Sequence, residues 1–118
     1  MIGIVVVSHS RALADAAVAL ASEMTDPDHR PSIKVAAGLD ETTFGTDAAA
    51  VSEAITAADS GDGVLVLLDL GSAVLSAEMA LEFLDPELAG RVRLSSAPLV
   101  EGLVGAAVAA GAGADLEA

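Results

Sequence analysis

The sequence predicts an α/β protein with an open, doubly wound, mainly parallel sheet, strand order 2-1-3-4 and helices on both faces. Four short apolar runs alternate with four helix-like segments along 118 residues, the pattern of strand–helix–strand units with right-handed crossovers. Aromatic residues are 2% of a chain that is 53% hydrophobic, so a core of Val, Leu, Ile and Ala is expected. The first and third runs are the most hydrophobic, which favours this order over a singly wound 1-2-3-4 order.

The first strand and helix follow from residue type and periodicity. Residues 2–7 are a β-branched run typical of a buried strand. Residues 11–24 are predicted to form a helix. Its apolar side chains share one stripe: Leu13, Ala17, Leu20 and Met24. Residues 33–37 form a weaker second strand, and a loop from Gly38 to Gly45 follows.

The second helix is predicted to begin at Thr46 as N-cap, with Asp47 in its first turn and Gly61 at its end. Its inner stripe is Val51, Ile55 and Ala58. The third strand lies within residues 63–69, and Gly71 and Ser72 open the third helix. Three acidic side chains of that helix share a solvent face: Glu78, Glu82 and Asp85.

Pro86 breaks the third helix, and residues 92–94 form a short strand that Arg93 marks as an edge. Pro98 fits the first turn of a last helix. That helix has no charge between Glu101 and Asp115, so it must be covered on most sides. A homodimer through its apolar side chains is expected: Val100, Leu103, Val104 and Val108. With no internal repeat or linker, residues 1–118 are expected to be one domain.

Charge and composition exclude several function classes. Eighteen acidic against five basic residues give a net charge of −13, which disfavours nucleic acid and anionic lipid as partners. The same charge suits basic protein partners, or serves solubility alone. The strongest apolar run, Val64–Leu68, is too short to span a membrane. Without cysteine or a recognisable secretory segment, a cytoplasmic location is expected.

The candidate site follows from the fold. In such a sheet, ligands bind beyond the carboxyl ends of the strands, where the strand order reverses. His9 follows the first strand there, and Asp69 ends the third. A carboxylate bonded to one ring nitrogen orients the imidazole and leaves the other nitrogen as nucleophile. The helices beginning near Ser10 and Ser72 direct N–H donors to the same crevice, where they suit a phosphoryl group.

Simpler interpretations compete with this site. His9 alone is compatible with an ordinary loop histidine, and Asp69 with a turn and helix cap. His29 lies in a turn with structural character, and two histidines without ligand spacing do not predict a metal site. Flavin binding lacks an aromatic residue to stack on the ring. A receiver domain would carry acidic residues where this chain has Ser8, His9 and Ser10.

Several motifs together resemble a known family. They are Val7-Ser8-His9-Ser10, Leu13-Ala14, Ala36-Ala37-Gly38, Gly45-Thr46-Asp47, Leu68-Asp69-Leu70-Gly71-Ser72-Ala73 and Ala97-Pro98-Leu99-Val100-Glu101-Gly102. The first two resemble the active histidine segment of the mannose-type enzyme IIA fold. The full set resembles the phosphotransferase subunit of phosphoenolpyruvate-dependent dihydroxyacetone kinase, over nearly the whole chain.

This resemblance implies a phosphotransferase with a phosphohistidine intermediate. A histidine phosphocarrier protein would phosphorylate His9 on the ring nitrogen farther from the backbone, and the group would pass to ADP on a dihydroxyacetone kinase subunit. The family is dimeric, and some members carry further phosphocarrier domains, which separate proteins would replace here. No metal or cofactor is needed. A mannose-family sugar-transport enzyme IIA and a phosphohistidine regulatory module remain the alternatives.

The resemblance and the fold together give a set of expected site residues. His9 is the phosphoryl acceptor and Asp69 its orienting partner. Residues expected to bind the phosphoryl group are Ser10, Gly71, Ser72, Gly38 and Thr46.

Overall fold

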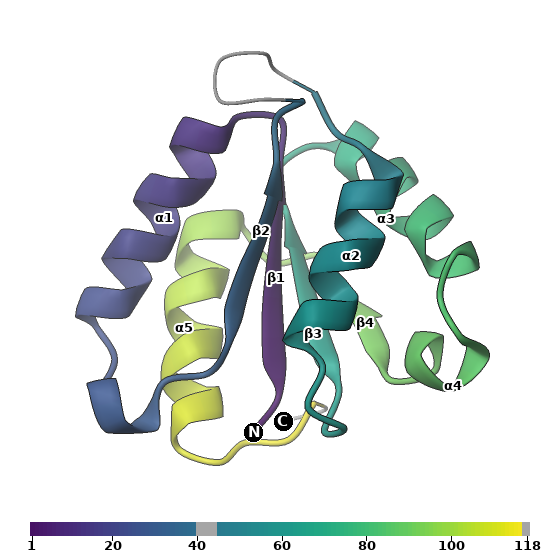
Figure 1. Ribbon diagram of the computed structural model, residues 1–118. Helices are drawn as coiled ribbons and strands as arrows, with labels where there is room; N and C mark the ends of the chain where they lie inside the picture. The colour runs from purple at the N-terminus through teal and green to yellow at the C-terminus, as the bar shows by residue number, and fades with distance from the viewer. Residues whose placement is uncertain (40–44, 117–118) are drawn as a thin grey trace.

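The computed structural model describes residues 1–39 and 45–116 and confirms the predicted α/β architecture (Figure 1). The described residues form a four-stranded parallel sheet in the order β2-β1-β3-β4. Its strands are β1 (Gly3–Ser8), β2 (Ile33–Ala37), β3 (Val64–Leu68) and β4 (Val92–Leu94). The two most apolar strands are therefore central, and the short β4 with its exposed Arg93 lies at the edge, as predicted.

Helices cover both faces of the sheet (Figure 1). One face carries α1 (Arg11–Glu23) and α5 (Leu99–Gly111). The other carries α2 (Ala48–Ala58) and α3 (Gly71–Glu82), with the short α4 (Pro86–Ala89) beyond them. Successive β1 side chains alternate between the two cores, because side chains of a strand point to opposite faces. Ile4 and Val6 pack under α1 and α5, whereas Val5 and Val7 pack under α2 and α3.

The apolar stripe predicted for α1 does not face the core except at Ala17. The side chains that α1 buries are Ala14, Ala17 and Ala21. Its larger apolar side chains, Leu13 and Leu20, are exposed, as is Met24 at its end. Small inner residues let the helix approach the sheet closely, and α3 is built the same way, with Ala73, Ala77 and Ala80 buried. The periodicity of apolar residues predicted the helix correctly, but it indicated the face next to the buried one.

Helix boundaries differ from the prediction in smaller ways. The N-cap of α2 is Asp47, whose carboxylate accepts from the Ala49 N–H at 3.0 Å, and not Thr46. Asp caps a helix at least as well as Thr, so either residue satisfied the sequence pattern. Pro98 stands at the N-cap of α5, one position before the first turn. The third helix ends at Glu82, so Asp85, which was predicted to share its solvent face, lies outside it. Asp85 is instead the N-cap of α4, which Pro86 starts.

Other predictions for the helices and turns can be compared directly. The inner stripe of α2 is confirmed, since Val51, Ile55 and Ala58 are buried. The predicted loop from Gly38 to Gly45 lies largely outside the described residues. Residues Pro27–His29 form a short 3-10 turn, η1, which follows α1. None of the helices within residues 1–39 and 45–116 combines the length and apolar character needed to cross a bilayer.

Close packing of α2 on the sheet also depends on one glycine. A Cβ atom at Gly3 would lie 2.1 Å from the carbonyl oxygen of Ala58, the last residue of α2. That distance is far below van der Waals contact, so a residue with a side chain would force α2 away from β1. Gly3 therefore fixes the separation between the first strand and the helix that follows the second.

Candidate functional site

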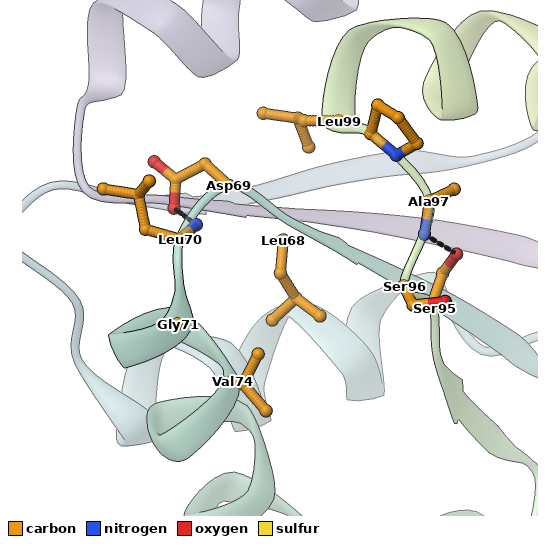
Figure 2. A pocket seen from close by; sticks show the side chains of 10 residues that line it. Leu68, Asp69, Leu70, Gly71, Val74, Ser95, Ser96, Ala97 and Leu99 are labelled. Carbon is orange, nitrogen blue, oxygen red and sulfur yellow. Dashed lines mark hydrogen bonds between the residues drawn. The ribbon is translucent and has the colours of Figure 1, made fainter.

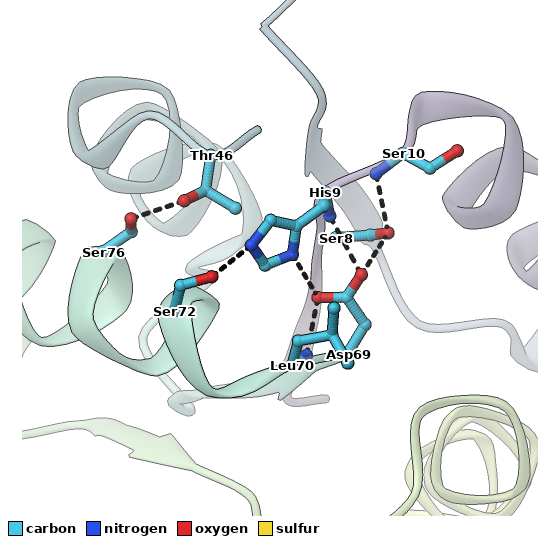
Figure 3. Close-up of polar contacts among 8 residues, drawn as sticks. All are labelled: Ser8, His9, Ser10, Thr46, Asp69, Leu70, Ser72 and Ser76. Carbon is cyan, nitrogen blue, oxygen red and sulfur yellow. Dashed lines mark hydrogen bonds and ion pairs between the residues drawn. The ribbon is translucent and has the colours of Figure 1, made fainter. Parts of the chain in front are cut away.

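The carboxyl ends of β1 and β3 lie side by side and bring His9 and Asp69 together (Figure 3). In this register Val7 pairs with Leu68, so the two strands leave the sheet at the same level. The Asp69 N–H donates to the Val7 carbonyl at 3.2 Å. The Nδ1 atom of His9 lies 2.9 Å from Oδ1 of Asp69. The two residues that the sequence selected from the strand ends are thus in direct contact.

Among the described residues, Asp69 accepts four hydrogen bonds, two on each carboxylate oxygen (Figure 3). Oδ2 accepts from the Ser8 hydroxyl at 2.8 Å and the His9 N–H at 2.9 Å. Oδ1 accepts from the His9 ring and from the Leu70 N–H at 2.7 Å. Burial raises the pKa of Asp69, but these donors outweigh it and bring the pKa below its ordinary value of 3.8. The carboxylate is therefore held ionised and fixed in orientation.

The contact with Asp69 sets the state of the His9 ring. Because the carboxylate can only accept, Nδ1 carries the proton and donates it, which leaves the lone pair on Nε2. On the other side of the ring, Nε2 is in contact with the hydroxyl of Ser72 in the first turn of α3 (Figure 3). The His9 side chain is 23% exposed and that of Asp69 10%. The ring is accordingly held at both nitrogens, by Asp69 at Nδ1 and by Ser72 at Nε2, and is partly exposed to solvent.

Two helices begin at the site, and their first turns differ. Ser10 is the N-cap of α1, and its hydroxyl accepts from the Leu13 N–H at 3.2 Å. Leu70 is the N-cap of α3 and has no side-chain oxygen or nitrogen with which to cap the first turn. The N–H groups of Gly71 and Ser72 therefore open α3 without a side-chain acceptor from Leu70. Such a start attracts an anion through its donors and the helix dipole.

The remaining predicted residues, Gly38 and Thr46, form hydrogen bonds to groups other than the His9 ring. The N–H of Gly38 donates to the Ser8 carbonyl at 3.1 Å, and its φ of 69° lets the chain turn sharply after β2. The hydroxyl of Thr46 lies 2.6 Å from that of Ser76 on α3 (Figure 3). Gly38 and Thr46 both form part of the wall beside the histidine. Neither is hydrogen-bonded to the His9 ring.

Sequence reasoning missed several residues that hold the site. Ser8 is fully buried, donates to Asp69 and accepts from the Ser10 N–H at 3.1 Å. Gly45 donates its N–H to the His9 carbonyl at 2.8 Å. The signal for Ser8 was a polar residue inside an otherwise apolar strand, since a buried hydroxyl requires partners. Gly45 belongs to the Gly45-Thr46-Asp47 motif but was given no role in the site, and nothing in the sequence distinguished Ser76.

A hollow of about 300 Å³ lies next to Asp69, between the starts of α3 and α5 (Figure 2). Residues from the two strand ends and helix starts line it: Leu68, Asp69, Leu70, Gly71, Val74, Ser95, Ser96, Ala97, Pro98 and Leu99. Neither His9 nor Ser72 belongs to its lining. This hollow therefore adjoins the Asp69 carboxylate, whereas Nε2 of His9 contacts Ser72 in the first turn of α3.

Chemically, the arrangement suits a nucleophilic histidine. Over the described parts of the chain, no three His, Asp or Glu side chains cluster as a metal ion would require. An imidazole with a partly buried carboxylate on Nδ1 and a helix start near Nε2 can attack an electrophilic phosphorus and hold the resulting anion. His29 offers no such setting, because it is an exposed side chain whose Nδ1 lies 3.2 Å from Asp26.

Comparisons with known proteins identify the family of the chain. Residues 3–118 match the family described as "PTS system fructose IIA component". The chain is 49% identical over 119 residues to "PEP-dependent dihydroxyacetone kinase, phosphoryl donor subunit DhaM" of Escherichia coli, covering 99% of this chain and 25% of that protein. It is 38% identical to the "PEP-dependent dihydroxyacetone kinase 2, phosphoryl donor subunit DhaM" of Listeria innocua, covering 92% of this chain and 85% of that protein.

A solved structure is also similar. The protein described as "Crystal structure of unknown function protein EF1359" superposes with a TM-score of 0.81 at 34% identity, covering 97% of this chain and 86% of that one. The chain thus spans about a quarter of the length of the Escherichia coli relative but most of the Listeria innocua relative. Both relatives are named as phosphoryl donor subunits of a kinase.

Proposed function

This chain belongs to the PTS system fructose IIA component family, and on that premise we propose that it is a phosphoryl carrier that works through His9. A histidine phosphocarrier protein phosphorylates Nε2 of His9. The phosphoryl group then passes to ADP bound on a dihydroxyacetone kinase subunit, and so supports the phosphorylation of dihydroxyacetone. The relatives named as phosphoryl donor subunits of that kinase support this assignment of substrate and partners.

One observation carries the proposal: the 2.9 Å contact between Nδ1 of His9 and Asp69. With the Nδ1 proton held by Asp69, the Nε2 lone pair attacks the phosphorus of the donor phosphohistidine. The new Nε2–P bond forms while the donor's N–P bond breaks, and its electron pair stays on the donor nitrogen. The ring gains positive charge in this step, and the ionised carboxylate on the opposite nitrogen offsets it.

Ser72 has two successive roles in this mechanism. In the resting state its hydroxyl donates to Nε2 and holds the ring facing the start of α3. To admit phosphorus, the hydroxyl turns away from Nε2 and donates to a phosphoryl oxygen instead. The N–H groups of Gly71 and Ser72 supply further donors, and no metal ion is required for transfer between two histidines.

The other predicted phosphoryl-binding residues act indirectly in this scheme. Ser10 caps α1 and fixes the chain directly after His9. Gly38 makes the turn beside Ser8, and Thr46 anchors the α2 start to α3 through Ser76. Ser10, Gly38 and Thr46 thus position the walls of the site, and residues of α3 contact the phosphoryl group directly.

We further propose that the carrier is a homodimer through α1 and α5. Exposed apolar side chains meet on that side of the molecule: Leu20 and Met24 of the α1 segment and Val108 of α5 are 44–58% exposed. Met24 and Val108 also line the same hollow, of about 420 Å³. Leu103, which the sequence placed in the interface, is buried in the chain's own core and is not available.

The decisive experiment is phosphorylation by phosphoenolpyruvate and the general phosphotransferase proteins. One phosphoryl group per chain is expected, acid-labile and alkali-stable, as a nitrogen–phosphorus bond requires. His9→Ala is expected to abolish the label without unfolding the protein. The matched control is His29→Ala, a change at an exposed histidine, which is expected to keep the label. Adding the ADP-binding kinase subunit and its dihydroxyacetone-binding partner must then yield dihydroxyacetone phosphate. Full labelling of the His9→Ala protein would refute the proposal.

A further inference from the structure

The outer face of α3 carries an apolar stripe that the fold does not use. Leu75, Met79 and Phe83 are spaced four residues apart, so they lie above one another along the helix. Each is 55–67% exposed, whereas the alanines of the opposite face of α3 fill the core. Three large apolar side chains in a row on a solvent face exceed the scattered exposure that a protein surface normally shows.

This stripe begins at the candidate site. At about 100° per residue, all three side chains lie within about 60° of Ser72 around the helix axis. Ser72 is the residue whose hydroxyl contacts Nε2 of His9. The stripe therefore begins beside the contact between Ser72 and Nε2 and extends along α3 for about 16 Å, the rise from Ser72 to Phe83. A protein that delivers a phosphoryl group to Nε2 from the Ser72 side must cover the nearer end of it.

Acidic residues border the stripe along one side. Glu78 and Glu82 are exposed on the same helix, and Asp85 follows at its end. A second copy of this chain placed here would bring like charges together around an apolar contact, which is unfavourable. A partner with an apolar centre and a rim of Lys and Arg would match both features. Apart from the exposed Glu101 in its first turn, α5 carries no charged residue, and its exposed side suits self-association better.

We propose that Leu75, Met79 and Phe83, bordered by Glu78 and Glu82, form the docking surface for the protein that phosphorylates His9. The occupant is a phosphoryl-donor protein whose own reactive group is surrounded by apolar and basic side chains. This inference rests on the proposed function, because it requires a protein donor for His9. Methionine and aromatic side chains are common at the centres of such transient contacts.

The first test compares a protein donor with a small-molecule donor. Met79→Asp places a charge in the centre of the stripe, and Ala57→Asp adds the same charge at an exposed position near the far end of α2. Met79→Asp is expected to slow second-order transfer from the phosphorylated donor protein by about tenfold or more. Phosphorylation by phosphoramidate, which needs no docking surface, stays unchanged. Ala57→Asp behaves as wild type with both donors.

The second test concerns the acidic border. Glu78→Gln with Glu82→Gln removes two charges beside the stripe, and Asp15→Asn with Glu23→Gln removes two from α1 on the opposite face. Only the first pair is expected to lower the transfer rate at low salt and to flatten its dependence on ionic strength.

The outcomes separate the two proposals. Unchanged transfer from the donor protein to the Met79→Asp variant overturns the docking surface and leaves His9 as acceptor. Conversion of a dimer to a monomer by Met79→Asp shows instead that the stripe is a contact between copies, which also overturns it. If His9 is labelled by neither donor in the wild-type protein, the proposed function fails and the docking surface fails with it.

Discussion

Replacing Asp69 by Asn tests the geometry of the site with the smallest available change. Both oxygens of Asp69 are acceptors facing donors: the Ser8 hydroxyl and His9 N–H on one, the His9 ring and Leu70 N–H on the other. An amide has one accepting oxygen and one NH2 group that can only donate. Either orientation of the amide therefore places its NH2 group against a backbone N–H that cannot reverse its polarity.

The two orientations have different consequences for the ring. With its oxygen toward the ring, the amide keeps the Nδ1 proton in place but opposes the His9 N–H. With its NH2 toward the ring, it opposes the Leu70 N–H and forces Nδ1 to accept, which moves the proton to Nε2 and removes the nucleophilic lone pair. A backbone donor left without an acceptor costs about 1–3 kcal/mol of folding free energy. Loss of the orienting partner costs about a hundredfold in transfer rate.

The difference in stability between wild type and Asp69→Asn depends on pH, because the pKa of Asp69 is lowered. Because the folded-state pKa lies below the ordinary value of 3.8, the carboxylate contributes its full stability above that value. The contribution is lost as the pH falls through the folded-state pKa. The stability gap between wild type and Asp69→Asn is therefore constant near neutral pH and narrows below about pH 4.

Two measurements check this prediction: urea unfolding across pH, and rapid-quench transfer to His9. The matched control is Asp47→Asn, the same chemical change at the exposed N-cap of α2, where Asn caps as well as Asp. Wild-type stability and wild-type transfer in Asp69→Asn would refute the role of Asp69 as an orienting carboxylate. A loss of stability alone would show that the carboxylate supports the loop and not the chemistry.

Further predictions concern the helix start, the packing, the assembly and the surface charge. Ser72→Ala should keep the fold and slow transfer about tenfold or more in rapid-quench assays, since a phosphoryl donor is lost. Gly3→Ala should lower the free energy of unfolding in urea by about 3 kcal/mol or more, because its Cβ would meet the Ala58 carbonyl at 2.1 Å. Val108→Asp should give a monomer by light scattering, and a wild-type monomer would contradict the dimer. Transfer from the donor protein to His9 should fall steeply from low to physiological ionic strength under second-order conditions, whereas a flat profile would assign the acidic surface to solubility.

The strands and their order were predictable because burial on both faces leaves a plain signal in the sequence. Residues 2–7 and 64–68 are continuous apolar runs, and the alternation with helices restricts the topology. Once the order was fixed, the adjacency of His9 and Asp69 followed from the parallel sheet itself. That step required no side-chain detail, because each residue directly follows one of two neighbouring strands.

The helix faces were less predictable, for a physical reason. In α1 the sequence offered both a leucine-rich stripe and an alanine-rich one, and hydrophobicity favoured the leucines. Tight contact with a sheet favours small side chains, so the alanines are inside and Leu13 and Leu20 remain outside. The same effect exposes Leu75 and Met79 on α3. On α1 and α3, which pack through alanines, the large apolar residues are therefore left at the surface.

Charge in this molecule acts at two distances, and the two effects have opposite signs. At the site, the start of α3 presents N–H donors to an incoming anion within hydrogen-bond range, where screening by salt is weak. Over the whole surface, the net charge of −13 repels a free anion but attracts a basic protein that carries one. The surface charge therefore repels a small free anion that approaches the protein. It attracts a basic carrier protein, which can bring its phosphoryl group to the donors beside His9. For the proposed function, an acidic exterior around a locally positive helix start thus favours transfer between proteins over capture of free phosphate.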